Sequence, residues 1–464
     1  MPAYYADEAL LPPGWARKVR IEVDARGEIS AVASDSSPEG ALRLAGPVLP
    51  GMANLHSHAF QRAMAGLAEV RAADADDFWT WRELMYRFVL RLSPEQAQAV
   101  ALHLYVEMLR HGYTAVAEFH YVHNDPDGNP YASRAEMSLR HLAAAREAGI
   151  AITLLPSLYA WSNFGGQALQ PRQRRFATDP AAVLEILEAV RKAAAGDRDV
   201  RLGVAPHSLR AVDTAILDEL VAGLMAIDPA APIHIHAAEQ TKEVADCIAW
   251  SGKRPVEWLL SRMPVNERWC VVHATHMTKE ETVALAKSGA VVGLCPSTEA
   301  NLGDGIFALQ DYRAAGGRYG IGGDCHVSRN PAEELRLLET VQRLVSRRRN
   351  LVVRAGSPAV GTTLWLEAAA GGGQALGRNM GAIEAGMRAD LVVLEDAHPD
   401  LAARTADAIA NALVFSGGEN FVRDVMVGGK WVVKEGRHAQ QDVAAHRYRR
   451  VLGELASTEG DFPE

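Results

Sequence analysis

Apolar, strand-like runs recur along this chain, and several of them end in histidine or acidic residues. In a parallel sheet that closes into a barrel, the carboxyl ends of all strands meet at one rim. Side chains that follow the strands would therefore converge, although they lie far apart in the sequence. The segments concerned are His56-Ser57-His58, Pro206-His207, His236 to Glu239, Val272-His273 and Gly323-Asp324.

The number and order of these runs favour one fold. Counting from the stretch at 48–58, there are eight runs, the later ones near residues 114–119, 150–156, 200–206, 232–236, 269–273, 290–294 and 319–324. Helical patterns separate them, as at 94–110, 181–195, 278–288 and 332–345. Alternating strands and helices favour a parallel sheet, and eight strands are what a closed barrel needs. We therefore predict an α/β fold with a TIM-like (β/α)8 barrel.

Both ends of the chain differ from this central part. The runs 19–23 and 29–32 alternate apolar and polar residues across a turn, which predicts a hairpin. Short alternating runs return beyond about residue 385, and Gly428-Gly429 between two of them indicates a second hairpin. We predict a small β-sandwich domain built from residues 1–48 and 376–464, with a catalytic barrel, residues 49–375, inserted between its halves.

The composition excludes several classes of protein. With 464 residues and 48% hydrophobic content, the chain can form a barrel of about 250 residues and a smaller domain. The net charge of −9 includes no long basic run, so we expect neither nucleic acid nor a membrane as a partner. Residues 1–19 lack a signal-peptide pattern and no apolar run would span a bilayer, so the expected location is the cytoplasm. The four cysteines are far apart, which favours buried thiols over disulfides.

The motif His56-Ser57-His58 predicts two metal ligands, because residues two apart in a strand share a face. The motif alone does not decide the matter, since two core histidines can have this spacing by chance. His236 at the end of the fifth strand and Asp324 after the last strand supply two further ligands. Three imidazole nitrogens and one carboxylate oxygen suit zinc better than calcium or magnesium. His234 lies deeper in its strand, where a hydrogen-bonded core histidine is the simpler interpretation.

Taken together, these residues resemble the amidohydrolase superfamily. The matching motifs are Pro50-Gly51-Met52, His56-x-His58, His236-x-x-Glu239, Val272-His273, Cys295-Pro296-Ser297 and Gly323-Asp324 with Ser328 after it. The fourth strand has no lysine of the kind that bridges two metal ions in dinuclear members. His-x-x-Glu after the fifth strand is typical of the mononuclear deaminase branch. The resemblance therefore implies one divalent ion, Zn²⁺ in our interpretation, held by His56, His58, His236 and Asp324.

Within that branch, the chain resembles the N-formimino-L-glutamate deiminase family. The similarity rests on residues 54–66, 79–82, 118–121 and 205–210. It implies hydrolysis of N-formimino-L-glutamate to N-formyl-L-glutamate and ammonia, a step of histidine degradation. It also implies that Asp324 accepts the water proton, that His273 steers the water and stabilises the tetrahedral centre, and that Glu239 carries a proton to the departing nitrogen. The implied substrate contacts are Gln61, Arg82, Tyr121, His207 and Arg210.

Charge supports the same class of substrate. Arg82 and Arg210 would follow the first and fourth strands, and each guanidinium can form a forked bond to a carboxylate. Ordinary surface arginines remain the alternative. For Gln61, Tyr121 and His207, taken singly, packing or local hydrogen bonding explains the residue equally well. The expected partners are a small dicarboxylate substrate and a second copy of the chain in a homodimer.

Several alternatives stay open. A deaminase of a purine or another amino-heterocycle could use the same scaffold, but it would depend little on Arg82 or Arg210. An inactive barrel used for assembly should have lost a metal ligand or the proton carrier, and none is missing. His276 could replace His273, although only His273 ends its strand. Cys325 should face away from the ion, because neighbouring residues of a strand alternate in direction.

Overall fold

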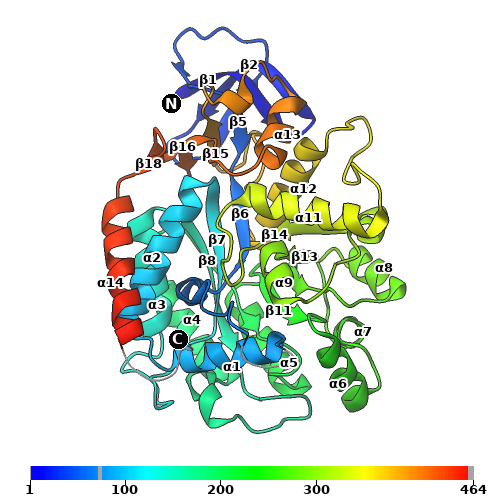
Figure 1. Ribbon diagram of the computed structural model, residues 1–464. Coiled ribbons are helices and arrows are strands. Elements are labelled where there is room, and N and C mark those ends of the chain that lie inside the picture. The colour runs from blue at the N-terminus through cyan, green and yellow to red at the C-terminus, as the bar shows by residue number, and fades with distance from the viewer. Residues whose placement is uncertain (1, 72–75, 458–464) are drawn as a thin grey trace.

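The computed structural model describes residues 2–71 and 76–457 (Figure 1). Residues 1 and 458–464, which belong to the predicted small domain, lie outside the described residues. Two parallel sheets form the centre of the fold. The first contains β6 (Met52–Ser57), β7 (Tyr113–His120), β8 (Ala151–Leu158), β9 (Val200–Leu202) and β10 (Ala205–Pro206). The second contains β11 (Ile233–Ala237), β12 (Trp269–His273), β13 (Val291–Leu294) and β14 (Arg318–Ile321).

Isolated parallel bridges join the two sheets on both sides. Ser57 pairs with Asp324, which links β6 to the segment after β14. Val204 pairs with Ile233, which links the β9–β10 segment to β11. If β9 and β10 count as one interrupted strand, the order is that of the predicted eight-stranded barrel, and the fold class agrees with the prediction.

Helices separate the strands, as the sequence predicts. Helix α2 shows why they begin where they do: Ser93 accepts a hydrogen bond from the N–H of Gln96, the Gln96 side chain accepts one from the N–H of Ser93, and Pro94 takes the first helical position. The helices of this part are α1 (Phe78–Val89), α2 (Pro94–Arg110), α3 (Glu136–Ala148), α4 (Pro180–Ala193), α5 (Thr214–Ile227), α6 (Thr241–Ser251), α7 (Pro255–Arg262), α8 (Lys279–Lys287), α9 (Pro296–Leu302), α10 (Leu309–Ala314), α11 (Pro331–Ser346) and α12 (Val360–Ala375), with short 3-10 turns η1 (Ala59–Met64) and η2 (Pro171–Phe176).

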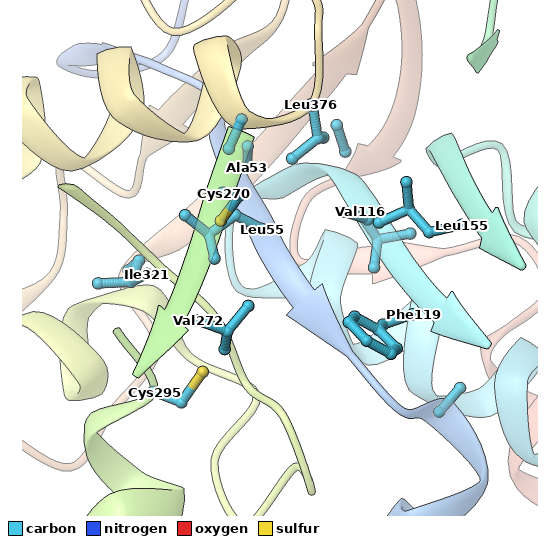
Figure 2. Packing of buried hydrophobic residues seen from close by; sticks show 14 of the residues in the cluster. Ala53, Leu55, Val116, Phe119, Leu155, Cys270, Val272, Cys295, Ile321 and Leu376 are labelled. Carbon is cyan, nitrogen blue, oxygen red and sulfur yellow. The ribbon is translucent and has the colours of Figure 1, made fainter. Parts of the chain in front are cut away.

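Apolar side chains fill the space between the strands. Figure 2 shows Leu55 close to Cys270, and Val116 close to Leu155, in the middle of this space. Phe119, Val272 and Cys295 lie nearer the carboxyl ends of the strands. Burial of each large apolar side chain contributes about 1.5–3 kcal/mol, so this filled core holds the strand ends in fixed positions.

The two ends of the chain meet in a nine-stranded sheet that holds its own apolar cluster. The cluster includes Ile21 and Val23 from one end of the chain and Leu391, Val393 and Met426 from the other. The predicted hairpins at 19–32 and 422–434 are present. The strands are β1 (Ala3–Leu11), β2 (Gly14–Val23), β3 (Ile29–Ala33), β4 (Leu42–Arg43), β5 (Val48–Pro50), β15 (Leu391–Leu394), β16 (Val422–Val427), β17 (Lys430–Lys434) and β18 (Arg437–His438), and η3 (Pro399–Leu401) and α13 (Asp407–Phe415) accompany them.

Two helices that the sequence analysis did not identify cover the barrel. Helix α14 (Gln441–Ser457) packs along α2, where the Tyr448 ring stacks on that of His103 at 4.3 Å (Figure 1). Helix α1 lies at the opposite end of the molecule from β1 and β2. Among the described helices, none is both long and apolar enough to cross a membrane.

Candidate active site

Four side chains from three strand ends point at one place. The Nε2 atoms of His56 and His236 are 3.0 Å apart, and those of His58 and His236 are 3.4 Å apart. Oδ1 of Asp324 lies 3.4 Å from Nε2 of His56 and 3.3 Å from Nε2 of His58. All four side chains are buried. The structure therefore brings together the whole set that the sequence predicts as metal ligands.

Two of the imidazoles carry their proton on Nδ1, which leaves Nε2 free to bind a metal ion. Nδ1 of His58 donates to the carbonyl of Phe119 at 2.7 Å, and Nδ1 of His236 donates to the carbonyl of His207 at 2.8 Å. Burial lowers the pKa of both rings below the ordinary histidine value, so each is neutral at pH 7 and its Nε2 has a lone pair. Two such lone pairs facing each other at 3.4 Å repel unless a cation lies between them.

The spacing of the donor atoms also suits a metal ion. Tetrahedral coordination with bonds of about 2.0–2.1 Å, as for zinc, places neighbouring ligand atoms about 3.3 Å apart. The four separations of 3.0–3.4 Å agree with this value. Fixing a ligand histidine through its second nitrogen is a common feature of metal sites, and His58 and His236 both have it. Nδ1 of His56 is buried without a hydrogen-bond partner among the described residues.

The backbone around the cluster explains how these segments reach one point. The N–H of Asp324 donates to the carbonyl of His56, and the N–H of His58 donates to the carbonyl of Asp324. A side chain at Gly322 would meet Cβ of His56 at 2.7 Å, so glycine is needed for this approach. Left-handed conformations are rare for other residues, yet Ala238, His273 and Asp324 have φ values of 54°, 66° and 47°. Strained positions of this kind gather at functional sites.

Of the three predicted catalytic residues, Asp324 belongs to the cluster, and Glu239 and His273 lie beside it. Nε2 of His273 lies 3.8 Å from Oε1 of Glu239 and 3.7 Å from Oδ2 of Asp324. Burial would lower the pKa of His273, but the nearby carboxylates of Glu239, Glu299 and Asp324 raise it to about 10. Burial raises the pKa of Glu239 to about 7, although His273 and Arg210 oppose the shift. A carboxyl group with a pKa near 7 can both accept and release a proton at neutral pH.

A pocket of about 540 Å³, open mouth included, lies directly over these groups. Both predicted arginines line it. Arg210 is 7% exposed, and its Nε and that of Arg82 are buried without a hydrogen-bond partner among the described residues. Both guanidinium groups lie over the ring of Trp79, at 4.5 Å for Arg82 and 5.7 Å for Arg210. The pocket thus offers two cationic groups held by aromatic contact, with donors to spare for an anionic ligand.

The remaining predicted contacts line the same pocket. Nε2 of Gln61 donates to the hydroxyl of Tyr121 at 2.7 Å, and Oε1 of Gln61 is buried without a partner in the described chain. The ring of His207 lies 5.5 Å from that of Tyr121. Burial lowers the pKa of His207 well below its ordinary value, and Arg210 adds to the effect. His207 is therefore neutral at pH 7.

The neighbouring residues that the sequence analysis weighed, His234, His276 and Cys325, have other contacts. Nε2 of His234 donates to the carbonyl of Ala375, and Nε2 of His276 donates to the carbonyl of Asp304. Sγ of Cys325 lies 3.1 Å from the hydroxyl of Thr298, and the four cysteines are buried free thiols, as predicted.

Sequence reasoning missed several residues around the pocket. The aromatic side chains of Tyr86, Tyr159 and Phe176 line it, and no motif marked them. Glu243 is fully buried and accepts the N–H groups of Ala238 and Glu239 at 3.2 and 3.1 Å, which holds the turn that carries the proton carrier. The signal that could have found it is its position in the first turn of α6, directly after the His236-x-x-Glu239 motif.

Comparison with known families gives two matches that together cover most of the chain. A model described as "Amidohydrolase family" matches residues 48–432. A model described as "Formimidoylglutamate deiminase HutF, N-terminal domain" matches residues 1–46.

Individual proteins are similar over nearly the whole length. A formimidoylglutamate deiminase from Pseudomonas aeruginosa is 55% identical over 457 residues, which cover 98% of this chain and 100% of that protein. A 5-methylthioadenosine/S-adenosylhomocysteine deaminase from Natronomonas pharaonis is 29% identical and covers 98% of each chain. The crystal structure of an amidohydrolase from Brucella melitensis has a TM-score of 0.93 at 48% identity and covers 98% of this chain and 100% of its own. An adenosine deaminase from Xanthomonas campestris with bound zinc, at 20% identity and a TM-score of 0.79 over 98% of each chain, is similar in fold alone.

Proposed function

This chain belongs to the amidohydrolase family, a family of metal-dependent hydrolases, and we propose that it hydrolyses N-formimino-L-glutamate to N-formyl-L-glutamate and ammonia. The observation that carries the proposal is the pair of arginines, Arg82 and Arg210, in a pocket over the His/Asp cluster. Their Nε atoms, which have no hydrogen-bond partner among the described residues, fit a ligand with carboxylates, whereas a neutral heterocycle would leave these two buried donors without a charged acceptor. The relative named formimidoylglutamate deiminase supports the same assignment.

We propose Zn²⁺ as the metal, held by His56, His58, His236 and Asp324. When bound, such an ion lowers the pKa of its water toward about 7 and supplies a nucleophile at neutral pH. The chain's own groups then manage the protons. The water oxygen bonds to the formimidoyl carbon, the bond from this carbon to the terminal nitrogen breaks, and the two water protons leave with that nitrogen as ammonia.

Each proton has a residue to carry it. Asp324 accepts the proton of the attacking water at Oδ2, the oxygen that faces His273. His273 steers the water through Nε2 and stabilises charge on the tetrahedral centre. Glu239, with a pKa of about 7, passes a proton to the departing nitrogen. Arg82 and Arg210 hold the carboxylates of the substrate, and Gln61, Tyr121 and His207 complete the pocket.

The test is analysis of the products. Zinc-loaded protein is incubated with N-formimino-L-glutamate, and ammonia and formamide are both measured. The expected result is one ammonia for each N-formyl-L-glutamate formed. Formamide with glutamate, or no turnover at all, would refute the assignment. Ammonia released from adenosine or another amino-heterocycle, and not from the diacid, would support the rival deaminase.

Three further expectations belong to this proposal. Residues 1–48 and 376–464 would form one discontinuous domain around a catalytic domain at 49–375, an idea supported by the apolar cluster that both chain ends share. The protein would be a cytoplasmic homodimer. Light scattering during size-exclusion chromatography should then give a mass near twice 50.1 kDa.

A further inference from the structure

Glu299 is a buried carboxylate at the edge of the site to which the proposed mechanism gives no part. It lies in α9 and is 7% exposed. Its Oε1 atom is 3.3 Å from Nδ1 of His273. The other nitrogen of the same ring, Nε2, faces Asp324 and Glu239 at 3.7 and 3.8 Å. One imidazole therefore joins Glu299 on one side to the reacting groups on the other.

We propose that Glu299 is a positioning residue for His273. Its carboxylate keeps a proton on Nδ1 and fixes the plane of the ring, so that Nε2 faces the attacking water and the tetrahedral centre. This inference rests on the role given to His273 in the proposed function. A carboxylate behind a histidine does the same work in catalytic triads and in the outer shell of metal sites.

His273 needs such support because its strand ends at this residue. His273 pairs with Ala237 as the last residue of β12, but its φ of 66° and that of Ala274, 50°, turn the chain sharply there, so the regular alternation of side chains along the strand does not fix the direction of this one. The ring stacks on that of His236, with 5.6 Å between centroids and 15° between planes. Stacking restrains the tilt of a ring but does not fix which way its two nitrogens point. The hydrogen bond from Nδ1 to Glu299 fixes that direction and leaves Nε2 facing the reacting groups.

Glu299 is itself held in place. Oε1 accepts the N–H of Cys295 at 2.9 Å, and the N–H of Glu299 donates to the carbonyl of Cys295 at 2.9 Å. A second buried acid, Glu334, holds the start of the same helix by accepting the N–H and the hydroxyl of Ser297 at 2.9 and 2.5 Å. Glu334 has no hydrogen bond to His273 among the described residues, so it provides a matched control for the placement of α9.

The contact with Cys295 makes a glutamine variant informative. In Glu299→Gln, the N–H of Cys295 requires the amide oxygen at the position of Oε1, so the acceptor for Nδ1 remains and only the charge is lost. Glu299→Ala removes both. Partners of this kind contribute about 10- to 100-fold, so we expect Glu299→Ala to lower kcat about 100-fold and Glu299→Gln to lower it less than about 10-fold. KM should change less than about 3-fold in both variants, because Arg82 and Arg210 are untouched.

A double-mutant cycle separates this role from a merely structural one. His273→Asn keeps a residue that tolerates positive φ and removes the imidazole. If Glu299 acts through His273, adding Glu299→Ala to His273→Asn should cause no further loss of kcat. A full additional loss would overturn the proposal, and so would a loss in Glu334→Gln as large as that in Glu299→Ala.

A measurement without substrate completes the test. In zinc-loaded protein with 15N-labelled histidine, the imidazole resonances that disappear in His273→Asn identify His273. We expect the NMR spectra of the wild type and of Glu299→Gln to show a proton on Nδ1 of this ring. In Glu299→Ala the pattern of nitrogen resonances from the ring should change, with equal zinc content in all three proteins. An unchanged pattern in Glu299→Ala would overturn the proposal. Because this experiment needs no turnover, a wrong substrate assignment would not be mistaken for a wrong role of Glu299.

Discussion

Replacing Arg210 by methionine tests the substrate class most directly. The two side chains have similar volume, and Arg210 is 7% exposed with its guanidinium beside Trp79, so the variant should keep the packing and lose the charge. If the guanidinium binds a carboxylate through two N–H groups, its removal abolishes two charge-assisted hydrogen bonds, each contributing about 1.5–3 kcal/mol. The loss of about 3–6 kcal/mol corresponds to a fall in kcat/KM of roughly 10²- to 10⁴-fold.

Most of this loss should appear as a higher KM, because the carboxylate is bound equally in the ground state and in the transition state. Arg82→Met should behave in the same way. Arg172→Met is the control: this arginine lies near α1, pairs with Glu83 and has a side chain 41% exposed. Ammonia release would be followed with N-formimino-L-glutamate and with N-formiminoglycine, which has one carboxylate fewer.

At least one of the two arginine variants should lose its defect with N-formiminoglycine, because the carboxylate that its guanidinium binds is missing there. The reasoning would be refuted by kcat/KM within about 3-fold of wild type in both variants, or by equal losses on both substrates in both variants.

Four further predictions follow from the same contacts. Glu239→Gln should keep its zinc and lose about 10²- to 10⁴-fold in kcat, whereas Asp324→Asn should lower both the zinc content and kcat. Metal analysis and steady-state kinetics measure the two effects, and near-normal rates in both variants would contradict the proposed roles. Removal of the metal by a chelator should lower the melting temperature, since an ion at 1,000 times its Kd stabilises the fold by about 4 kcal/mol, and His236→Ala should abolish the response to added zinc. Burial raises the pKa of Glu334 to about 8 from 4.5, so its contribution to stability is complete below about pH 4.5 and is lost as the pH rises toward 8. Urea unfolding at several pH values should therefore show a smaller fall in the free energy of unfolding over this range in Glu334→Gln than in the wild type. Trp79→Leu should raise KM for the diacid with little change in kcat, because the indole contacts both guanidinium groups, and an unchanged KM would argue against that role.

The barrel strands and the cluster of histidines could be predicted because each depends on a local pattern. Apolar runs that end in His58, His236 and His273 place the side chains at strand ends, and the barrel topology then brings the ends together. The bipartite sheet could be predicted for a similar reason, since Gly428-Gly429 marks a hairpin whatever its partners are.

Features that depend on tertiary contacts could not be predicted in this way. Helix α14, with 17 residues, was not identified from the sequence, because it is stabilised by packing against α2, and no local pattern reveals that contact. The contacts of Trp79 are another example, because only the structure shows two guanidinium groups over its ring.

The buried acids of the site show the same limit most clearly. Glu243 and Glu299 are single acidic residues in helical segments, where glutamate is ordinarily a solvent-exposed residue. In the structure each accepts a backbone N–H of a turn, and each acts on a charged or polar group of the site, Glu243 on Arg210 and Glu299 on His273. Since a buried carboxylate is unfavourable unless such partners compensate for lost hydration, these two residues indicate where the fold gives up stability to hold His273 and Glu239 in place. Glu299→Gln, which keeps an acceptor for the N–H of Cys295 and removes the charge, should therefore unfold at a urea concentration no lower than that of the wild type while kcat falls by up to about 10-fold. A variant that loses stability and activity together would show instead that the carboxylate serves the fold.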